Sequence, residues 1–103
     1  MIFLVQRKQD ELATLCRRFN VRRLELFGSA ATDDFDSARS DLDFLVEFLP
    51  QQDLGPWLRH YFDLRDELAR LFERPVDLVM AEAVKDPRFR SELERTRVLL
   101  YAA

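Results

Sequence analysis

The sequence predicts an α/β protein, in its α+β form, with helices packed on a small mixed sheet. Segments with helical spacing of apolar residues alternate with short apolar segments typical of strands. Glycine occurs only at Gly28 and Gly55, so each marks a turn between elements. The predicted order is helix, strand, strand, helix, strand, helix, and the 103 residues suit one domain spanning 1–103.

The first half of the chain predicts one helix and two strands. Apolar residues spaced as on one helix face predict a helix over about 7–19, and Val21–Phe27 reads as a strand that ends before the first glycine. Small, polar and acidic residues over 28–40 indicate a loop or a short helical turn, and a second strand follows over Asp41–Phe48. The residues on the helix face are Leu12, Leu15, Cys16 and Phe19.

The second half predicts two helices and one or two strands. A helix with an apolar face starts at Trp57 and stops before Pro75, and Val76–Met80 is a third short strand. Asp86 followed by proline is typical of a helix N-cap, so a helix runs on to about residue 95. The last apolar residues, 98–101, form either a short final strand or a continuation of that helix.

Composition limits the classes of function. The net charge of −3 argues against direct binding of nucleic acid through a basic surface. One cysteine allows no internal disulfide, which favours a reducing, cytoplasmic setting. No apolar stretch is long enough to cross a membrane or to form a signal-peptide core, so we expect the whole chain to be mature sequence.

Two carboxylates alternate along the second predicted strand. Side chains alternate between the faces of a strand, so Asp41 and Asp43 point the same way, about 6.5 Å apart along the strand. Like charges this close repel each other, and their apolar neighbours add a desolvation cost. A divalent cation such as Mg²⁺ reverses that balance, since it binds carboxylates together with substrate phosphates.

A third carboxylate and a glycine-serine pair complete the pattern. Asp77 lies in the third strand and can reach the same site if the two strands are neighbours. Three such carboxylates suit two-metal phosphoryl chemistry, with Asp77 serving the second metal or acting as the base. Gly28 lets the backbone approach a phosphate closely, and the Ser29 hydroxyl and the following N–H groups can bind its oxygens.

In this order, the motifs resemble those of the polymerase-beta-type nucleotidyltransferases. The short chain resembles the minimal nucleotidyltransferase (MNT) subfamily over nearly its whole length. The resemblance implies that Gly28 and Ser29 bind ATP as substrate, and that Asp41, Asp43 and Asp77 are catalytic and bind Mg²⁺ at up to two sites. It also implies transfer of a nucleotidyl group, usually AMP, to a hydroxyl. MNT proteins are often antitoxins paired with a HEPN-domain toxin, and some AMPylate a tyrosine on that partner.

The chain departs from the family pattern in its spacer. Ala30–Ser40 is one residue longer than expected, and it carries Asp33, Asp34 and Asp36 where relatives often have a basic residue. Extra acid near a triphosphate is unfavourable, which leaves a second hypothesis open: a catalytically weak module that neutralises a HEPN toxin by binding it. A third hypothesis, transfer to a small molecule such as an aminoglycoside, is disfavoured because no added domain holds the acceptor.

Plain structural explanations remain for the same residues. Asp41 could simply start a strand, and Asp43 could guard an edge strand against aggregation. Cys16 is expected in the core, and His60 on a solvated helix flank. Trp57, Tyr61 and Phe62 are expected mainly in the core, and Arg88, Arg90, Arg95 and Arg97 on a solvated face.

The sequence also predicts a protein partner, whereas a homo-oligomer stays an open alternative. A domain of this size buries less of its surface than a larger one, so a partner that covers one face would stabilise it. The candidate docking residues are Ile2, Phe3 and Leu4 at the N-terminus and the aromatic segment around Trp57 and Phe62.

Overall fold

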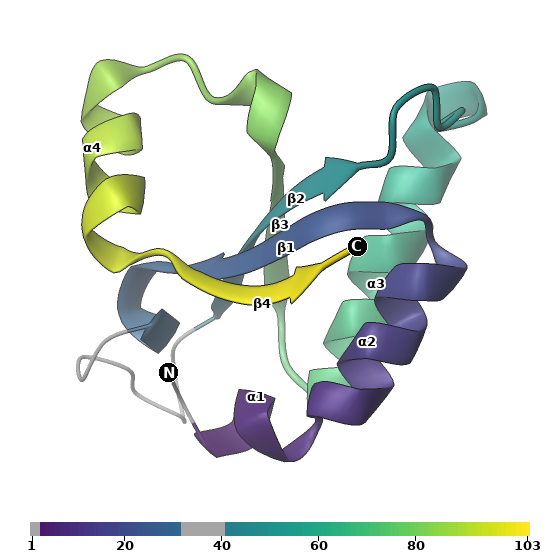
Figure 1. The fold of residues 1–103 in the computed structure, drawn as a ribbon, viewed down its shortest axis with the longest axis horizontal. Coiled ribbons are helices and arrows are strands. Elements are labelled where there is room, and N and C mark those ends of the chain that lie inside the picture. The colour runs from purple at the N-terminus through teal and green to yellow at the C-terminus, as the bar shows by residue number, and fades with distance from the viewer. Residues whose placement is uncertain (1–2, 32–40) are drawn as a thin grey trace.

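A four-stranded mixed sheet forms the centre of the molecule (Figure 1). The computed structural model describes residues 3–31 and 41–103. The strand order is β3-β2-β1-β4, with β1 antiparallel to both of its neighbours and β2 parallel to β3. The strands are β1 Val21–Phe27, β2 Leu42–Phe48, β3 Val76–Met80 and β4 Val98–Ala102. This mixed sheet confirms the predicted fold class.

Helices cover both faces of this sheet (Figure 1). On one face, α2 and α3 bury the larger core against the sheet, and on the other α4 covers a smaller apolar cluster. The helices are α1 Phe3–Arg7, α2 Gln9–Arg18, α3 Arg59–Phe72 and α4 Pro87–Thr96, and short 3₁₀ turns occupy Gly28–Ala31, Pro56–Leu58 and Ala81–Ala83. None of the described helices is long and apolar enough to span a membrane.

Alternation along β2 decides which side chains face which layer. Leu42, Phe44 and Val46 are buried in the core beneath α2 and α3. Asp43 and Leu45 point to the opposite face, where Leu45 joins the cluster under α4. The predicted division of this strand into an apolar face and a face bearing carboxylates is therefore confirmed.

Several predicted boundaries need correction. The N-terminal helix is shorter than 7–19, because a turn at Lys8 separates α1 from α2. The second helix starts at Arg59 and not at Trp57, since Trp57 and Leu58 both have a positive φ of 56°. Trp57 is 93% exposed, so its expected place in the core was wrong. These two residues follow Gly55 and belong to the 3₁₀ turn Pro56–Leu58, whose left-handed backbone angles separate it from α3.

The structure also decides between a strand and a helix at the C-terminus, and it shows the surroundings of Cys16 and His60. Residues 98–102 form β4, because Arg97 leaves the helix with extended backbone angles. Cys16 is fully buried, as predicted, and burial raises the pKa of its thiol to about 12. His60 is only half-solvated, since its ring packs on Phe19 and Phe48 and its Nε2 lies 2.6 Å from the Phe19 carbonyl oxygen.

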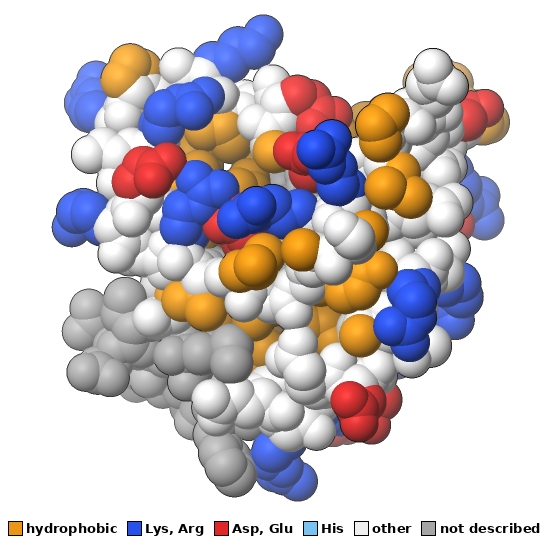
Figure 2. Space-filling view, viewed as in Figure 1, with side chains coloured by type: hydrophobic (Ala, Val, Ile, Leu, Met, Phe, Trp, Pro, Cys, Tyr) orange, Lys and Arg blue, Asp and Glu red, His pale blue; other side chains and the backbone are white. Residues whose placement is uncertain are grey.

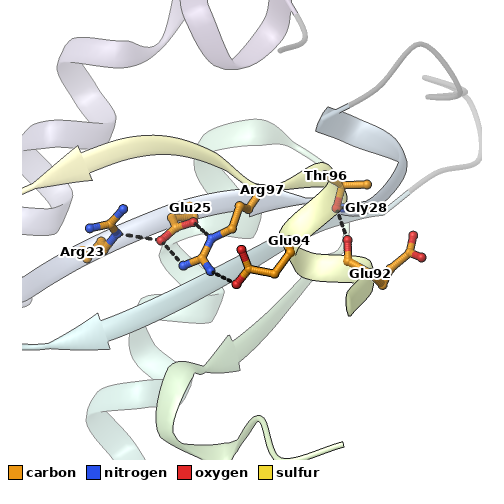
Figure 3. Close-up of polar contacts among 7 residues, drawn as sticks. All are labelled: Arg23, Glu25, Gly28, Glu92, Glu94, Thr96 and Arg97. Atoms are coloured by element: carbon orange, nitrogen blue, oxygen red, sulfur yellow. Dashed lines mark hydrogen bonds and ion pairs between the residues drawn. The ribbon is translucent and has the colours of Figure 1, made fainter. Parts of the chain in front are cut away.

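An ion pair between Arg97, directly after α4, and the buried Glu25 carboxylate fastens the end of α4 to β1 (Figure 3). Glu25 is 2% exposed, and its carboxylate accepts two hydrogen bonds from Arg97, at 2.5 and 2.8 Å, and one from Arg23 at 2.6 Å. These bonds hold the pKa of Glu25 below its ordinary value despite the burial. Arg97 is exposed, as expected, and it also pairs with the buried Glu25 carboxylate.

We expect Glu25→Gln to lower the free energy of unfolding by about 2 kcal/mol at neutral pH, because charge-assisted hydrogen bonds are lost. The pKa of Glu25 is lowered on folding, so the ionised carboxylate stabilises the fold above its ordinary pKa. This stabilisation disappears as the pH falls through the folded-state pKa, so the two proteins should converge in acid. Urea unfolding at about pH 7 and about pH 3 measures the difference.

Glu94→Gln is the matched control, because Glu94 also pairs with Arg97 but is largely exposed. Its loss should change the free energy of unfolding by less than about 0.5 kcal/mol. Equal destabilisation by both variants would contradict the special role of the buried carboxylate.

Candidate active site

Asp43 and Asp77 lie side by side on the face of the sheet that α4 partly covers. In the parallel pairing of β2 with β3, Asp43 is the direct register partner of Asp77. Neighbouring strands are about 5 Å apart, so the two side chains leave the same face at adjacent positions. The structure thus brings together two carboxylates that are 34 positions apart in the sequence.

Gly28 lies directly against the Asp43 carboxylate. It follows β1 with a φ of 73°, and a Cβ atom placed on it would be 2.5 Å from Asp43 Oδ2. A side chain at this position would therefore collide with the carboxylate as well as strain the backbone. Gly28, which the sequence associates with phosphate binding, therefore packs against Asp43, the candidate metal ligand.

Negative charge accumulates at Asp43. Burial, the Asp77 carboxylate and the Asp41 carboxylate, in that order, raise its pKa from 3.8 to about 6. All three causes disfavour the ionised form, so the folded protein keeps this carboxylate in a setting that costs free energy. A carboxylate whose ionised form is disfavoured in this way is typical of a functional site rather than of a charge that only protects an edge strand from aggregation.

Asp41 lies just before β2 and not within it, since the strand begins at Leu42. It is exposed and close enough to raise the pKa of Asp43. Over residues 3–31 and 41–103, however, no three acidic, histidine or cysteine side chains gather closely enough to form a ready-made metal site. The closest association is therefore the Asp43–Asp77 pair, with Asp41 at its margin.

Part of the predicted site lies outside the described residues. Ser29 belongs to the 3₁₀ turn Gly28–Ala31, so its backbone follows β1 as expected, but its side chain is outside the described part. The same holds for the acidic residues Asp33, Asp34 and Asp36 of the spacer. Their predicted roles stay predictions.

The donor set fits a divalent cation. The carboxylates of Asp43 and Asp77 supply hard oxygen atoms on one face, and burial together with the neighbouring carboxylates raises the pKa of Asp43. Mg²⁺ commonly takes one or two carboxylates and fills its other positions with water and substrate phosphate. Two adjacent carboxylates beside a glycine turn therefore fit this mode of Mg²⁺ binding.

Two residues near the site were not predicted from the sequence. Thr96, the last residue of α4, accepts a hydrogen bond from the Gly28 N–H, and Glu25 anchors the end of α4 through Arg97 (Figure 3). The acid inside an apolar strand, Arg23-Leu24-Glu25-Leu26-Phe27, was the available signal, because a charge on a covered sheet face needs a partner.

A mixed sheet with two neighbouring carboxylates, one of them packed on a glycine turn, fits a nucleotidyltransferase domain. The comparisons agree, since the family model for the nucleotidyltransferase domain matches residues 11–100. The chain is also 35% identical, over 80 residues, to a candidate protein adenylyltransferase from Methanocaldococcus jannaschii, a match that covers 78% of this chain and 76% of that protein. The chain belongs to the nucleotidyltransferase domain family, as the resemblance predicts.

Solved structures show the same fold. A candidate minimal nucleotidyltransferase is 28% identical with a TM-score of 0.71, over 91% of this chain and 90% of the other. A chain from a complex of tri-AMPylated HEPN toxin from Shewanella oneidensis with MNT antitoxin gives 19% identity and a TM-score of 0.66, over 96% and 73%. A chain from a toxin–antitoxin complex with AMP-PNP gives 20% and 0.70, over 92% and 73%.

Proposed function

We propose that this protein is a metal-dependent nucleotidyltransferase that moves AMP from ATP to a hydroxyl on a partner protein, as the antitoxin of a HEPN/MNT pair. The observation that carries the proposal is the adjacency of Asp43 and Asp77, with Gly28 packed against Asp43. The related candidate protein adenylyltransferase supports the reaction, and the complexes of HEPN toxin with MNT antitoxin and with AMP-PNP support the partner and the nucleotide.

Each site residue has a role that its place in the fold suggests. The turn after β1 would receive the triphosphate, with backbone N–H groups and the Ser29 hydroxyl as donors. Asp43, assisted by Asp41, would hold the Mg²⁺ that accompanies the triphosphate. Asp77, on the neighbouring strand, would serve the attacking hydroxyl, and a second metal if one binds.

The reaction exchanges one phosphorus–oxygen bond for another. The acceptor oxygen forms a bond to the α-phosphorus, while the bond from that phosphorus to the bridging oxygen breaks and pyrophosphate leaves with the electron pair. Asp77 takes the proton of the attacking hydroxyl, and the turn at Gly28 keeps the triphosphate aligned for an in-line displacement. When bound, the divalent cation would offset the phosphate charge and make that hydroxyl easier to deprotonate.

The same residues suggest a setting for the protein. We infer that residues 1–103 act as one domain in the cytoplasm, where the single buried Cys16 stays a thiol. Incubation with labelled ATP and the proposed HEPN-domain partner tests the proposal, since label should appear on that protein.

The acidic spacer supports a second candidate function, neutralisation of a HEPN toxin by binding alone. The spacer after Ser29 carries Asp33, Asp34 and Asp36, and their charge opposes that of a triphosphate. A protein with weak or no transfer could still neutralise a HEPN toxin by covering it. Tight binding of the partner without any labelling would favour this second function.

An exposed apolar patch offers a surface for that partner. Trp57 and Leu58, in the 3₁₀ turn before α3, and Phe62, in the first turn of α3, are all exposed, and we call these three residues the aromatic patch. Soluble proteins seldom expose such side chains together without a binding role. Among the other candidates, Ile2 and the side chains of Phe3 and Leu4 lie outside the described residues.

We expect Trp57→Ser to weaken binding of the HEPN partner by at least about tenfold, because exposed tryptophans at interfaces are frequent hot spots. The free energy of unfolding should hardly change, since Trp57 makes little contact within the chain. Calorimetric titration of the partner measures the effect. Leu99→Thr alters an exposed apolar residue on β4 and is the control; equal weakening by both would remove the aromatic patch from the interface.

A further inference from the structure

The hydroxyl of Thr96 joins the end of α4 to the turn that follows β1. Its Oγ1 accepts the Gly28 N–H at 3.1 Å and donates its own proton to the Glu92 carbonyl oxygen at 3.0 Å (Figure 3). The two ends of this contact are 68 positions apart in the sequence. The hydroxyl thus uses its single proton within the helix, and its lone pair is free to hold the glycine.

This contact acts on the candidate active site through Gly28. The space for a Cβ atom on Gly28 is already taken by Asp43 Oδ2, at 2.5 Å. A shift of the glycine toward β2 would collide with that carboxylate, and a shift away would open a gap beside it. By holding the Gly28 N–H, Thr96 therefore fixes the position of the turn against which the Asp43 carboxylate packs.

The end of α4 is itself firmly attached. Arg97 follows Thr96 directly and is bonded to the buried Glu25 of β1 by two hydrogen bonds. Earlier in α4, the ring of Phe89 packs edge-on against the ring of Phe27 in β1, with 5.6 Å between the ring centroids. Basic side chains gather over the region where α4 meets the sheet, with acidic side chains partly beneath them (Figure 2). Thr96 therefore sits on a rigid support rather than on a loose helix end.

We propose that Thr96 is a positioning residue for nucleotide binding: its hydroxyl holds the Gly28 turn in register with Asp43. This inference rests on the proposed function. Because the Gly28 N–H is already used, the backbone donors offered to phosphate begin at Ser29. Thr96 touches neither nucleotide nor metal and acts only through the glycine.

Amide exchange tests the contact without any nucleotide. The chain has two glycines, so their amide signals can be told apart in a nitrogen–proton spectrum. Thr96→Val removes the hydroxyl but keeps the shape, and should speed exchange at Gly28 by roughly tenfold or more. Gly55 donates to Asp53 Oδ1 at 2.8 Å in a distant turn and should not change. Thr96→Ser, which restores the hydroxyl, should restore the slow exchange.

Nucleotide affinity tests whether loss of the Thr96–Gly28 contact weakens nucleotide binding. Calorimetry with AMP-PNP and Mg²⁺ should show binding weakened roughly fivefold or more by Thr96→Val, the effect of one hydrogen bond, and recovered in Thr96→Ser. Thr14→Val is the matched control, because Thr14 Oγ1 also donates to the carbonyl oxygen four residues earlier, at 3.1 Å, on α2. Both valine variants lose the hydrogen bond within their helix, but only Thr96→Val should lose affinity.

The outcomes separate the inference from the proposed function. Unchanged exchange at Gly28 in Thr96→Val, or unchanged AMP-PNP affinity once that exchange has become fast, would overturn the positioning role. Absence of AMP-PNP binding in the wild-type protein would contradict the proposed function instead, and Gly28 exchange would still show whether Thr96 holds the turn.

Discussion

Asp43→Asn should weaken Mg²⁺-dependent binding of ATP by at least about a hundredfold, while the nucleotide-free protein becomes more stable near neutral pH. Both effects come from one carboxylate. Burial and the charges of Asp77 and Asp41 raise the pKa of Asp43 to about 6, so its ionised form opposes folding. That cost is absent below the ordinary pKa and appears as the pH rises through the folded-state value, so the stability gain should vanish in acid.

Calorimetry at fixed Mg²⁺ measures the affinity, and urea unfolding measures the stability. Asp41→Asn should weaken binding less, because Asp41 lies at the margin of the pair. Glu47→Gln is the matched control, since Glu47 lies on β2 and on the same face but pairs with Arg22. Equal ATP affinity in wild type and Asp43→Asn would remove the metal site from this strand.

Asp77→Asn should abolish most transfer, by about 10²–10⁴-fold in rate, while changing ATP affinity by less than about threefold. Gly28 packs on Asp43, so we expect nucleotide binding to depend mainly on this first carboxylate. Asp77 is exposed on the edge strand β3, where it can meet the acceptor hydroxyl. An interaction made only in the transition state changes the rate and leaves binding intact.

Mass spectrometry of the HEPN partner after incubation with ATP measures the rate of AMP transfer. Glu82→Gln, an exposed acid just beyond β3, is the control and should transfer normally. Undiminished labelling by Asp77→Asn would show that another residue is the third acid.

The fold could be predicted where local pattern and tertiary role agree. Val21–Phe27 was predicted to the residue, because its apolar side chains face a core and Gly28 takes a positive φ directly after it. The segment at Trp57 was wrong, because aromatic residues at helical spacing do not reveal a left-handed backbone. The sequence marks apolar side chains but not whether anything in the chain covers them.

The site was only partly predictable for a similar reason. Asp43 and Asp77 could be found because each interrupts a short apolar strand, and their adjacency follows once β2 and β3 pair in parallel. The contacts of Thr96 with Gly28 and of Arg97 with Glu25 span about 70 positions each, and no spacing rule connects such residues. Positions that support a site from another element become visible only in the fold.

Labelling with ATP that carries the isotope at either the α- or the γ-phosphate tests the nucleotidyltransferase assignment most directly. The purified protein, the proposed HEPN-domain partner and Mg²⁺ are incubated with each ATP, and label on the HEPN protein is followed. We expect label from the α-phosphate only, abolished by Asp43→Asn and Asp77→Asn. Label from the γ-phosphate, or none from either ATP while the two proteins bind tightly, would contradict it.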